Sequence, residues 1–251
     1  MTQDQQEKAI MIEPGFYNLD CMDGMAQFPD KFFELAIVDV PYGIGEDGRK
    51  ESSRIRTTEK WKNPAPPKYI VKQWDNSSPD KSYFKELMRV SKKQIIWGAN
   101  HFISKIPYDS SGWIVWYKNG QTPNCDFSDC ELAWTNFKKA VRYFAFPWTG
   151  FGAVNAKETR IHPTQKPIAL YKWLLSNYAK PGDKILDTHV GSASSLIACH
   201  QLGFEYWGFE LDTDYYKAAT ERLDKAKAQV DIFEACELPK PEQIGIVEVE
   251  K

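Results

Sequence analysis

The chain has no excess of basic residues, no cysteine pair with metal-binding spacing and no long apolar run. Its 251 residues carry a formal net charge of −2, which excludes a protein that binds nucleic acid through overall positive charge. The five cysteines are scattered without a C-x-x-C pair, which indicates a reducing setting and predicts no metal site. The polar N-terminus and the lack of a membrane-length apolar window predict a cytoplasmic protein with no membrane partner.

Apolar, strand-like stretches alternate with helical ones along the chain. The predicted strands cover residues 33–38, 94–97, 113–116, 184–187 and 206–211. The predicted helices cover residues 80–91, 167–178, 194–202 and 214–230, where apolar residues recur at helical spacing. This alternation predicts a single α/β domain over residues 1–251, with a mostly parallel sheet and helices on both faces.

A carboxylate directly follows the apolar strand at residues 33–38. The motif Asp39-Val40-Pro41-Tyr42 places an acid, a backbone carbonyl and an aromatic ring at the carboxyl end of that strand. Pro41 restricts Val40 to an extended conformation and thereby fixes where its carbonyl points. Because open α/β sheets bind ligands at this edge, the motif predicts a ligand site there.

A second strand, turn and helix are typical of a nucleoside-binding unit. The strand ends in Asp187, the turn contains Gly191 and Ser192, and Glu210 ends the following strand. Small turn residues let a ligand approach the amides at a helix N-terminus, and an acid such as Glu210 can accept hydrogen bonds from ribose hydroxyls. The G-x-G-x-x-G pattern that makes room for a diphosphate is absent, so S-adenosyl-L-methionine is the predicted cofactor.

The motif at residues 39–42 resembles the Asp-Pro-Pro-Tyr signature of amino-methylating DNA methyltransferases. The segment 160–167, R-I-H-P-T-Q-K-P, is similar to the element that precedes the cofactor strand in the permuted, β-class members of that family. The segments 18–30, 95–102 and 129–134 also resemble the family, most closely its compact bacterial and phage members. The resemblance implies a Rossmann-like, S-adenosylmethionine-dependent methyltransferase fold with a circularly permuted motif order.

The resemblance also implies the residues of the site. The catalytic residues would be Asp39, Val40, Pro41 and Tyr42. The cofactor-binding residues would be Asp20, Asp39, His162, Thr164, Gln165, Lys166, Asp187, Gly191, Ser192 and Glu210. Trp97 and Trp134, which lie in the similar segments, are predicted to be core aromatics.

In this family the target base leaves the duplex so that its exocyclic amine reaches the methyl group of the cofactor. The resemblance implies that the Asp39 carboxylate and the Val40 carbonyl accept the two N–H bonds of that amine. Those bonds orient the lone pair and stabilise the positive charge that develops on nitrogen. Tyr42 would stack on the extruded base, a contact that contributes about 1–3 kcal/mol.

The chain departs from the family pattern at three places. Val40 replaces the first proline, Thr188-His189 stands where Pro-Phe is usual, and Ala193 stands where glycine is usual. These changes predict weaker cofactor binding rather than its loss. We interpret His189 as a packing or hydrogen-bonding residue, because methyl transfer to an amine needs no strong base beforehand.

A basic segment, residues 45–73, directly follows the Asp39 motif. Its prolines prevent a continuous helix, and its place beside the predicted site favours a mobile loop that holds a phosphate backbone over a solvated insertion. The predicted DNA contacts are Arg49, Lys50, Arg54, Arg56, Lys60 and Lys62.

The predicted target is the N6 amine of adenine in DNA. Asp at the first motif position is more typical of adenine enzymes, and Ser is more typical of cytosine-N4 enzymes. Cytosine-N4 methylation, methylation of RNA or protein amines, and a catalytically weak DNA-binding homologue are the alternatives. Cytosine-C5 chemistry is disfavoured because the chain has no Pro-Cys pair. Dimerisation is common in this class, so a homodimer is also considered.

Overall fold

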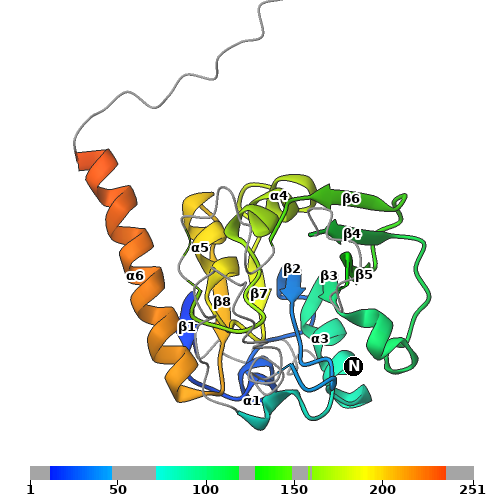
Figure 1. Cartoon of the computed structure of the whole chain (residues 1–251). Helices are drawn as coiled ribbons and strands as arrows, with labels where there is room; N and C mark the ends of the chain where they lie inside the picture. Colours follow the sequence, from blue (N-terminus) through cyan, green and yellow to red (C-terminus); the bar gives the residue numbers. More distant parts are fainter. Residues whose placement is uncertain (1–11, 47–71, 119–127, 149–157, 159, 236–251) are drawn as a thin grey trace, which may run out of the picture.

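The computed structural model describes residues 12–46, 72–118, 128–148, 158 and 160–235. Within these residues, eight strands form one sheet in the order β1-β8-β7-β2-β3-β5-β4-β6 (Figure 1). The strands are β1 (Gly15–Tyr17), β2 (Phe33–Val38), β3 (Ser91–Trp97), β4 (Trp113–Tyr117), β5 (Cys130–Thr135), β6 (Arg142–Ala145), β7 (Ile185–Asp187) and β8 (Tyr206–Phe209). The helices are α1 (Cys21–Met25), α3 (Lys81–Val90), α4 (Ile168–Tyr178), α5 (Ser194–Gln201) and α6 (Thr213–Ala235), with 3-10 turns η2 (Gln73–Asp75), η3 (Ala99–His101) and η4 (Ile103–Lys105).

The strands run mostly parallel. Only β5 is antiparallel to its neighbours, β3 and β4, among the strand pairs that the described residues form. The central strand β2 pairs with β3 on one side and with β7 on the other. Five of its six side chains are buried, as expected for a parallel strand that helices cover on both faces. The prediction of a mostly parallel α/β sheet is confirmed.

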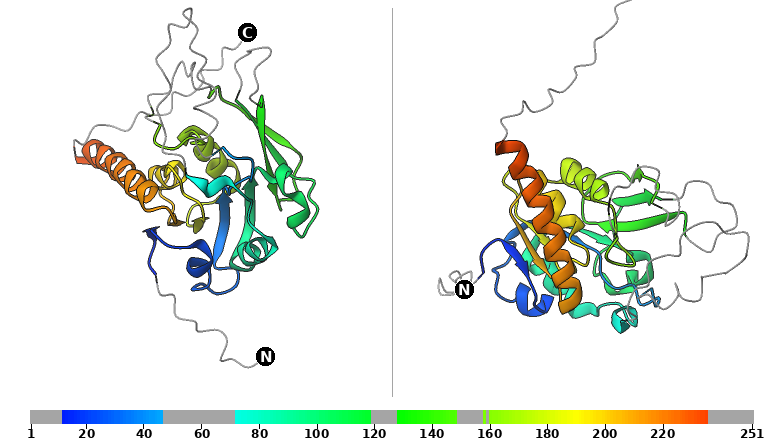
Figure 2. Two further views of the ribbon diagram at one scale, coloured as in Figure 1. Left: turned by 60° about the horizontal axis from the view of Figure 1, so that its bottom comes forward. Right: turned by 60° about the vertical axis from the view of Figure 1, so that its left-hand side comes forward.

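Helices cover both faces of the sheet, as predicted (Figures 1 and 2). On one face, α1 and α3 bury side chains such as Phe84 and Leu87 against β2 and β3. On the other face, α4, α5 and α6 bury side chains such as Leu174 and Ile197. The helix α6 lies outside α5, at the side of the sheet where β1 and β8 pair.

The aromatic residues of the similar segments belong to the core. Trp97 and Trp134 are fully buried, on opposite faces of the sheet. Trp97 packs edge-on against Trp116, with ring centroids 6.4 Å apart. The prediction that Trp97 and Trp134 are core aromatics is therefore confirmed.

The direction of the sheet connections reverses between β2 and β7. From β2 the chain passes through α3 to β3, and from β7 it passes through α5 to β8 on the other side. The helices α3 and α5 cover opposite faces. Open α/β sheets bind ligands at the carboxyl ends of the strands where this reversal occurs, so the ends of β2 and β7 mark the expected ligand site.

Several elements differ from the sequence predictions. The strands β1, β5 and β6 and the short helix α1 were not predicted as elements, and β3 begins three residues before the predicted strand. Hydrophobic periodicity does not reveal the antiparallel strand β5, because this strand is defined by its pairing with β3 and β4 in the folded chain. In the part of the chain that the structure describes, no helix combines the length and apolar character needed to cross a bilayer.

Candidate active site

Four carboxylates lie at or just beyond the carboxyl ends of parallel strands. Asp39 follows β2, Asp187 ends β7, Glu210 follows β8 and Asp20 lies three residues after β1. Because β2 and β7 are hydrogen-bonded neighbours, Asp39 and Asp187 lie at adjacent strand ends. The two motifs that are far apart in the sequence therefore meet at one edge of the sheet.

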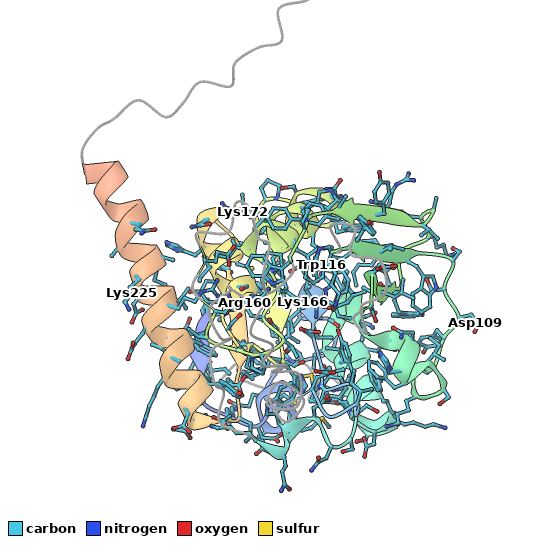
Figure 3. All side chains as sticks on the ribbon, in the orientation of Figure 1. Asp109, Trp116, Arg160, Lys166, Lys172 and Lys225 are labelled. Carbon is cyan, nitrogen blue, oxygen red and sulfur yellow. The ribbon has the colours of Figure 1, made fainter. Side chains whose placement is uncertain are left out.

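Asp39 belongs to a partly buried polar cluster with Tyr42, Glu131 and the fully enclosed Lys166. The Lys166 ammonium lies 2.6 Å from Asp39 Oδ1 and 3.0 Å from Glu131 Oε2. It also donates to the Tyr42 hydroxyl, which in turn lies 2.9 Å from Asp39 Oδ1. Glu131 receives a second ammonium, from Lys118, at 2.7 Å. Lys166 lies inside the molecule, whereas Asp109 lies at its periphery (Figure 3).

Burial disfavours the charged forms of the residues in this cluster, and their opposite charges favour those forms. Burial raises the pKa of Asp39 above its ordinary value, although Lys166 opposes the rise. Burial also disfavours the charged form of Glu131, but Lys166 and Lys118 outweigh it and lower the Glu131 pKa to about 2. Burial opposes the Lys166 ammonium as well, yet Asp39 and Glu131 raise its pKa. Lys166 therefore favours the charged forms of both Asp39 and Glu131.

The Tyr42 ring lies between the turn that follows β3 and the Lys166 side chain. The exposed His101 stacks on it, with ring centroids 5.2 Å apart. Gly98, at φ +70°, approaches so closely that a Cβ there would lie 2.0 Å from Tyr42 Cε1. The Lys166 ammonium lies 5.5 Å from the centroid of the Tyr42 ring. The position of Tyr42 thus depends on the absence of a side chain at residue 98.

The turn between β7 and α5 is built by hydrogen bonds to two of the acids. Glu210 Oε2 accepts the amide of Gly191 at 2.9 Å, and Asp187 accepts the amide of His189 and the hydroxyl of Ser195. Gly191 and Ala193 both have positive φ values, +55° and +60°. The alanine in place of glycine therefore stands in a conformation that costs an L-residue about 1–2 kcal/mol.

The acids at this edge repel one another. Burial raises the pKa of Asp187 to about 7, and the negative charges of Asp39 and Glu210 add to the rise. Burial also raises the pKa of Glu210. A ligand that brings a positive charge and hydrogen-bond donors would relieve this repulsion. S-adenosyl-L-methionine has both, in its sulfonium and amino groups and its ribose hydroxyls, so the acids fit this cofactor.

The segment 160–167 lies against this turn. The ring of His162 is 3.8 Å from the position that a Cβ on Gly191 would take, and it packs on Tyr215 with ring centroids 4.3 Å apart. Gln165 is buried and closes its own turn, since its side chain accepts the amide of Ile161. Of the other residues predicted to bind the cofactor, Thr164 is exposed, and Lys166 reaches Asp39.

The remaining predicted residues have clear places. Asp20 caps α1 by accepting the amide of Met22, and Ser192 is buried with its hydroxyl 3.1 Å from that of Ser194. Val40 is buried, and Pro41 is partly exposed beside it. Arg49, Lys50, Arg54, Arg56, Lys60 and Lys62, the predicted DNA contacts, lie outside the described residues.

The two ends of the basic segment are nevertheless fixed. The buried Asp75 carboxylate accepts the amides of Gly43 and Glu46, each at 2.7 Å, and its carbonyl accepts the amide of Gly45. Lys72 forms an ion pair with Asp212, just before α6. The chain that leaves the turn after Tyr42 at residue 46 thus returns to that turn at residue 75.

His189 and Thr188, the departures from the family pattern, form a small polar network. The Thr188 hydroxyl lies 2.6 Å from the hydroxyl of Tyr83, on α3, and 2.9 Å from His189 Nδ1. The Tyr83 ring packs edge-on against His189, with centroids 5.4 Å apart. This network supports the interpretation of His189 as a hydrogen-bonding residue rather than a base.

We expect His189→Phe to reduce the loss of stability in acid. Burial lowers the His189 pKa to about 4, so the unfolded chain binds a proton below pH 6.5 that the folded chain does not bind. Stability is therefore lost as pH falls from 6.5 to 4, by about 2 kcal/mol per buried histidine between pH 7 and pH 5. Urea unfolding at both pH values should show that the variant loses less unfolding free energy than the unmodified protein, by this amount.

The exposed His101 provides the control for that measurement. His101→Phe should lose as much stability between pH 7 and pH 5 as the unmodified protein does. An equal loss in His189→Phe and the unmodified protein would show that His189 is not held neutral by burial.

The sequence did not point to Glu131, Lys118 or Asp75 as site residues. Glu131 lies in the strand β5, within a segment that resembles the family, but only the aromatic residue there was considered. A single acid next to the apolar run Leu132-Ala133-Trp134 was the available signal. Asp75 had no signal, because its partners are backbone amides far along the chain.

Comparison with known proteins finds similarity to DNA methylases. Residues 113–221 match the family model described as DNA methylase. The chain is 26% identical over 220 residues to "Putative methylase YubD" of Escherichia coli (strain K12), a match that covers 83% of this chain and 89% of that protein. The chain is thus similar to DNA methylases. It is also 30% identical over 133 residues to "Type II methyltransferase M2.DpnII" of Streptococcus pneumoniae, covering 44% of this chain and 50% of that protein.

The fold is that of an S-adenosylmethionine-dependent methyltransferase. The solved structure of the PvuII DNA methyltransferase, which is described as cytosine-N4-specific, superimposes with a TM-score of 0.53 at 10% identity. That match covers 86% of this chain and 92% of the PvuII chain. S-adenosyl-L-methionine is the cofactor of the family, and the acids at the ends of β2, β7 and β8 fit it.

Proposed function

We propose that the protein transfers a methyl group from S-adenosyl-L-methionine to the N6 amine of a flipped adenine in DNA. The observation that carries the proposal is the position of Asp39. Its carboxylate lies at the end of β2, beside the β7 end where the cofactor turn begins. A base amine bound by Asp39 would therefore lie next to the predicted cofactor site.

The residues of the site can orient and activate an amine. The bound cofactor supplies an electrophilic methyl group on a sulfonium. Asp39 and the Val40 carbonyl accept the two N–H bonds and leave the nitrogen lone pair free. As nitrogen bonds to carbon, the negative charge of Asp39 stabilises the positive charge that forms. The surplus proton of the methylated amine then passes to the Asp39 carboxylate.

Asp39 favours adenine over cytosine as the target. Asp rather than Ser at the first motif position is more typical of adenine enzymes, which supports N6 as the methylated atom. The fold alone favours neither base, since a cytosine-N4-specific enzyme shares it. Adenine-N6 methylation is therefore our proposal, and cytosine-N4 methylation is its alternative.

The test is methyl transfer from labelled S-adenosyl-L-methionine to unmethylated bacterial DNA, followed by mass spectrometry of the nucleosides. N6-methyladenine is the expected product. N4-methylcytosine would replace the adenine assignment, and label in RNA or protein but not in DNA would refute the proposal. Cofactor binding measured by calorimetry in parallel would show whether an inactive preparation still binds its cofactor.

Phosphate contacts are proposed for the basic segment that follows the motif. We expect that DNA binding weakens and depends less on salt when four of its basic residues are neutralised, namely Arg49, Lys50, Arg54 and Arg56. A protein that contacts fewer phosphates releases fewer counterions when it binds. For four contacts, the slope of log affinity against log salt should fall by about 3–4. Binding titrations at several salt concentrations measure this, and an unchanged slope would remove the segment from the DNA contact.

The control is a pair of lysines on two helices. Lys172 lies on α4 and Lys225 lies on α6 (Figure 3). Neutralising this pair removes half as many positive charges as the change in the basic segment. An equal fall in slope per charge removed would show that overall charge, and not the basic segment, governs DNA binding.

A further inference from the structure

One oxygen of the carboxylate that must receive the base amine is already occupied. Asp39 Oδ1 receives both the Lys166 ammonium, at 2.6 Å, and the Tyr42 hydroxyl, at 2.9 Å. An entering amine needs the same carboxylate as its acceptor, and the proposed function passes the surplus proton of the amine to it. The Lys166 ammonium therefore shares this carboxylate with the substrate and needs a second carboxylate when Asp39 takes up that proton.

Lys166 has such a partner in Glu131. The ammonium lies 3.0 Å from Glu131 Oε2, so it can leave Asp39 without leaving its second carboxylate. The side chain of Lys166 is 3% exposed, and a buried ammonium without a carboxylate would cost several kcal/mol. The aromatic rings of Trp97 and Tyr42, each 5.5 Å from the ammonium, complete its surroundings.

Glu131 is itself fixed by a second lysine. Lys118, at the end of β4, lies 2.7 Å from Glu131 Oε1, on the oxygen that Lys166 does not use. The pairing of β4 with β5 brings Trp116 opposite Glu131, which places Lys118 close by. Glu131 thus has one oxygen for each lysine and a rigid strand behind it.

We propose that Glu131 is a positioning residue for methyl transfer. It keeps the Lys166 ammonium paired when Asp39 binds the amine of the base and takes up its proton. This inference rests on the proposed function, and it adds to it a residue that contacts neither the base nor the cofactor. The role is electrostatic, since the charges of Asp39, Glu131, Lys166 and Lys118 sum to zero before the base enters and Glu131 keeps Lys166 neutralised afterwards.

The proposal predicts a specific defect in Glu131→Gln. Without the Glu131 charge, Lys166 has only Asp39 as a carboxylate partner and stays on it. The single-turnover rate of methyl transfer should fall at least tenfold, and the affinities for DNA and for S-adenosyl-L-methionine should stay within twofold. Glu131→Asp restores the charge and should recover part of the rate. Glu205→Gln, which removes the same charge from an exposed residue just before β8, is the matched control and should be unaffected.

A double-mutant cycle separates positioning from a general structural role. If Glu131 acts through Lys166, then Glu131→Gln should lower the rate by less than twofold in a Lys166→Gln background. A rate loss in that background equal to the loss in the unmodified protein would overturn the proposal. So would a Glu131→Gln variant with an unchanged single-turnover rate. If Glu131→Gln alone does not fold, the double variant, which removes one charge of each sign, is compared with Lys166→Gln: equal rates support the proposal and a slower double variant refutes it.

The same assay separates this inference from the proposed function. Methyl transfer by the unmodified protein to DNA tests the function. A protein that methylates DNA with a rate that is independent of Glu131 would refute the positioning role and leave the function intact. A protein that binds S-adenosyl-L-methionine and transfers no label to DNA would refute the function itself.

Discussion

Asp39→Ala is expected to lower the rate of DNA methylation about 10²–10⁴-fold, the usual effect of removing a group that orients and accepts a proton in the transition state. The variant loses the carboxylate that would accept the amine of the base. Lys166 keeps Glu131 as its partner at 3.0 Å, so the buried ammonium is not left alone and the fold should survive. Single-turnover methylation of DNA measures the effect.

Cofactor binding distinguishes a chemical defect from a folding defect in this variant. Asp187 and Glu210, on β7 and after β8, are unchanged, so calorimetry should still detect S-adenosyl-L-methionine. Asp109→Ala, at an exposed position on the periphery, is the control for the substitution itself and should retain full activity (Figure 3). Asp39→Ala with more than a tenth of the normal rate would refute the role of this carboxylate.

Gly98→Ala is expected to displace Tyr42 and to reduce methylation at least tenfold. The new Cβ would lie 2.0 Å from Tyr42 Cε1, well inside van der Waals contact, so the ring must move. The movement would break the hydrogen bond from the Tyr42 hydroxyl to Asp39. Overpacking and the positive φ of +70° together should lower the unfolding free energy by about 2–4 kcal/mol.

Gly182 separates the two causes in that prediction. It has a similar conformation, with φ at +87°, but no atom lies within 4 Å of a Cβ there. Gly182→Ala should therefore lose only the backbone cost of about 1 kcal/mol and keep its methylation rate. Equal losses of stability and full activity in both Gly98→Ala and Gly182→Ala would show that methylation does not depend on the close approach of residue 98 to Tyr42.

The strand ends of the site were predictable because each is a local pattern. An apolar run followed by Asp39, and another followed by Asp187, indicate the edge of a parallel sheet without any knowledge of the partners. Both strands end at the predicted residues, and they turn out to be neighbours. Neither sequence pattern predicts that β2 and β7 are neighbours, since this depends on which strands pair.

The charge cluster around Lys166 could not be predicted for the same reason. Its members come from the turn after β2, from β5, from the end of β4 and from the segment before α4. The family resemblance assigned Lys166 to the cofactor, and the structure shows its ammonium on Asp39. The left-handed conformation of Ala193 has no signal in the residue itself, because alanine is not favoured there; the glycine that is usual at this position in the family was the available signal.

The hydrogen bonds from residues 43, 45 and 46 to Asp75 tie the polypeptide together at the base of the basic segment. Whatever chain connects residue 46 to residue 72 starts and finishes on a closed junction, so changes in its length or composition need not disturb Tyr42. The segment is thus an exchangeable insert, whose sequence can change while the residues around Tyr42 keep their places.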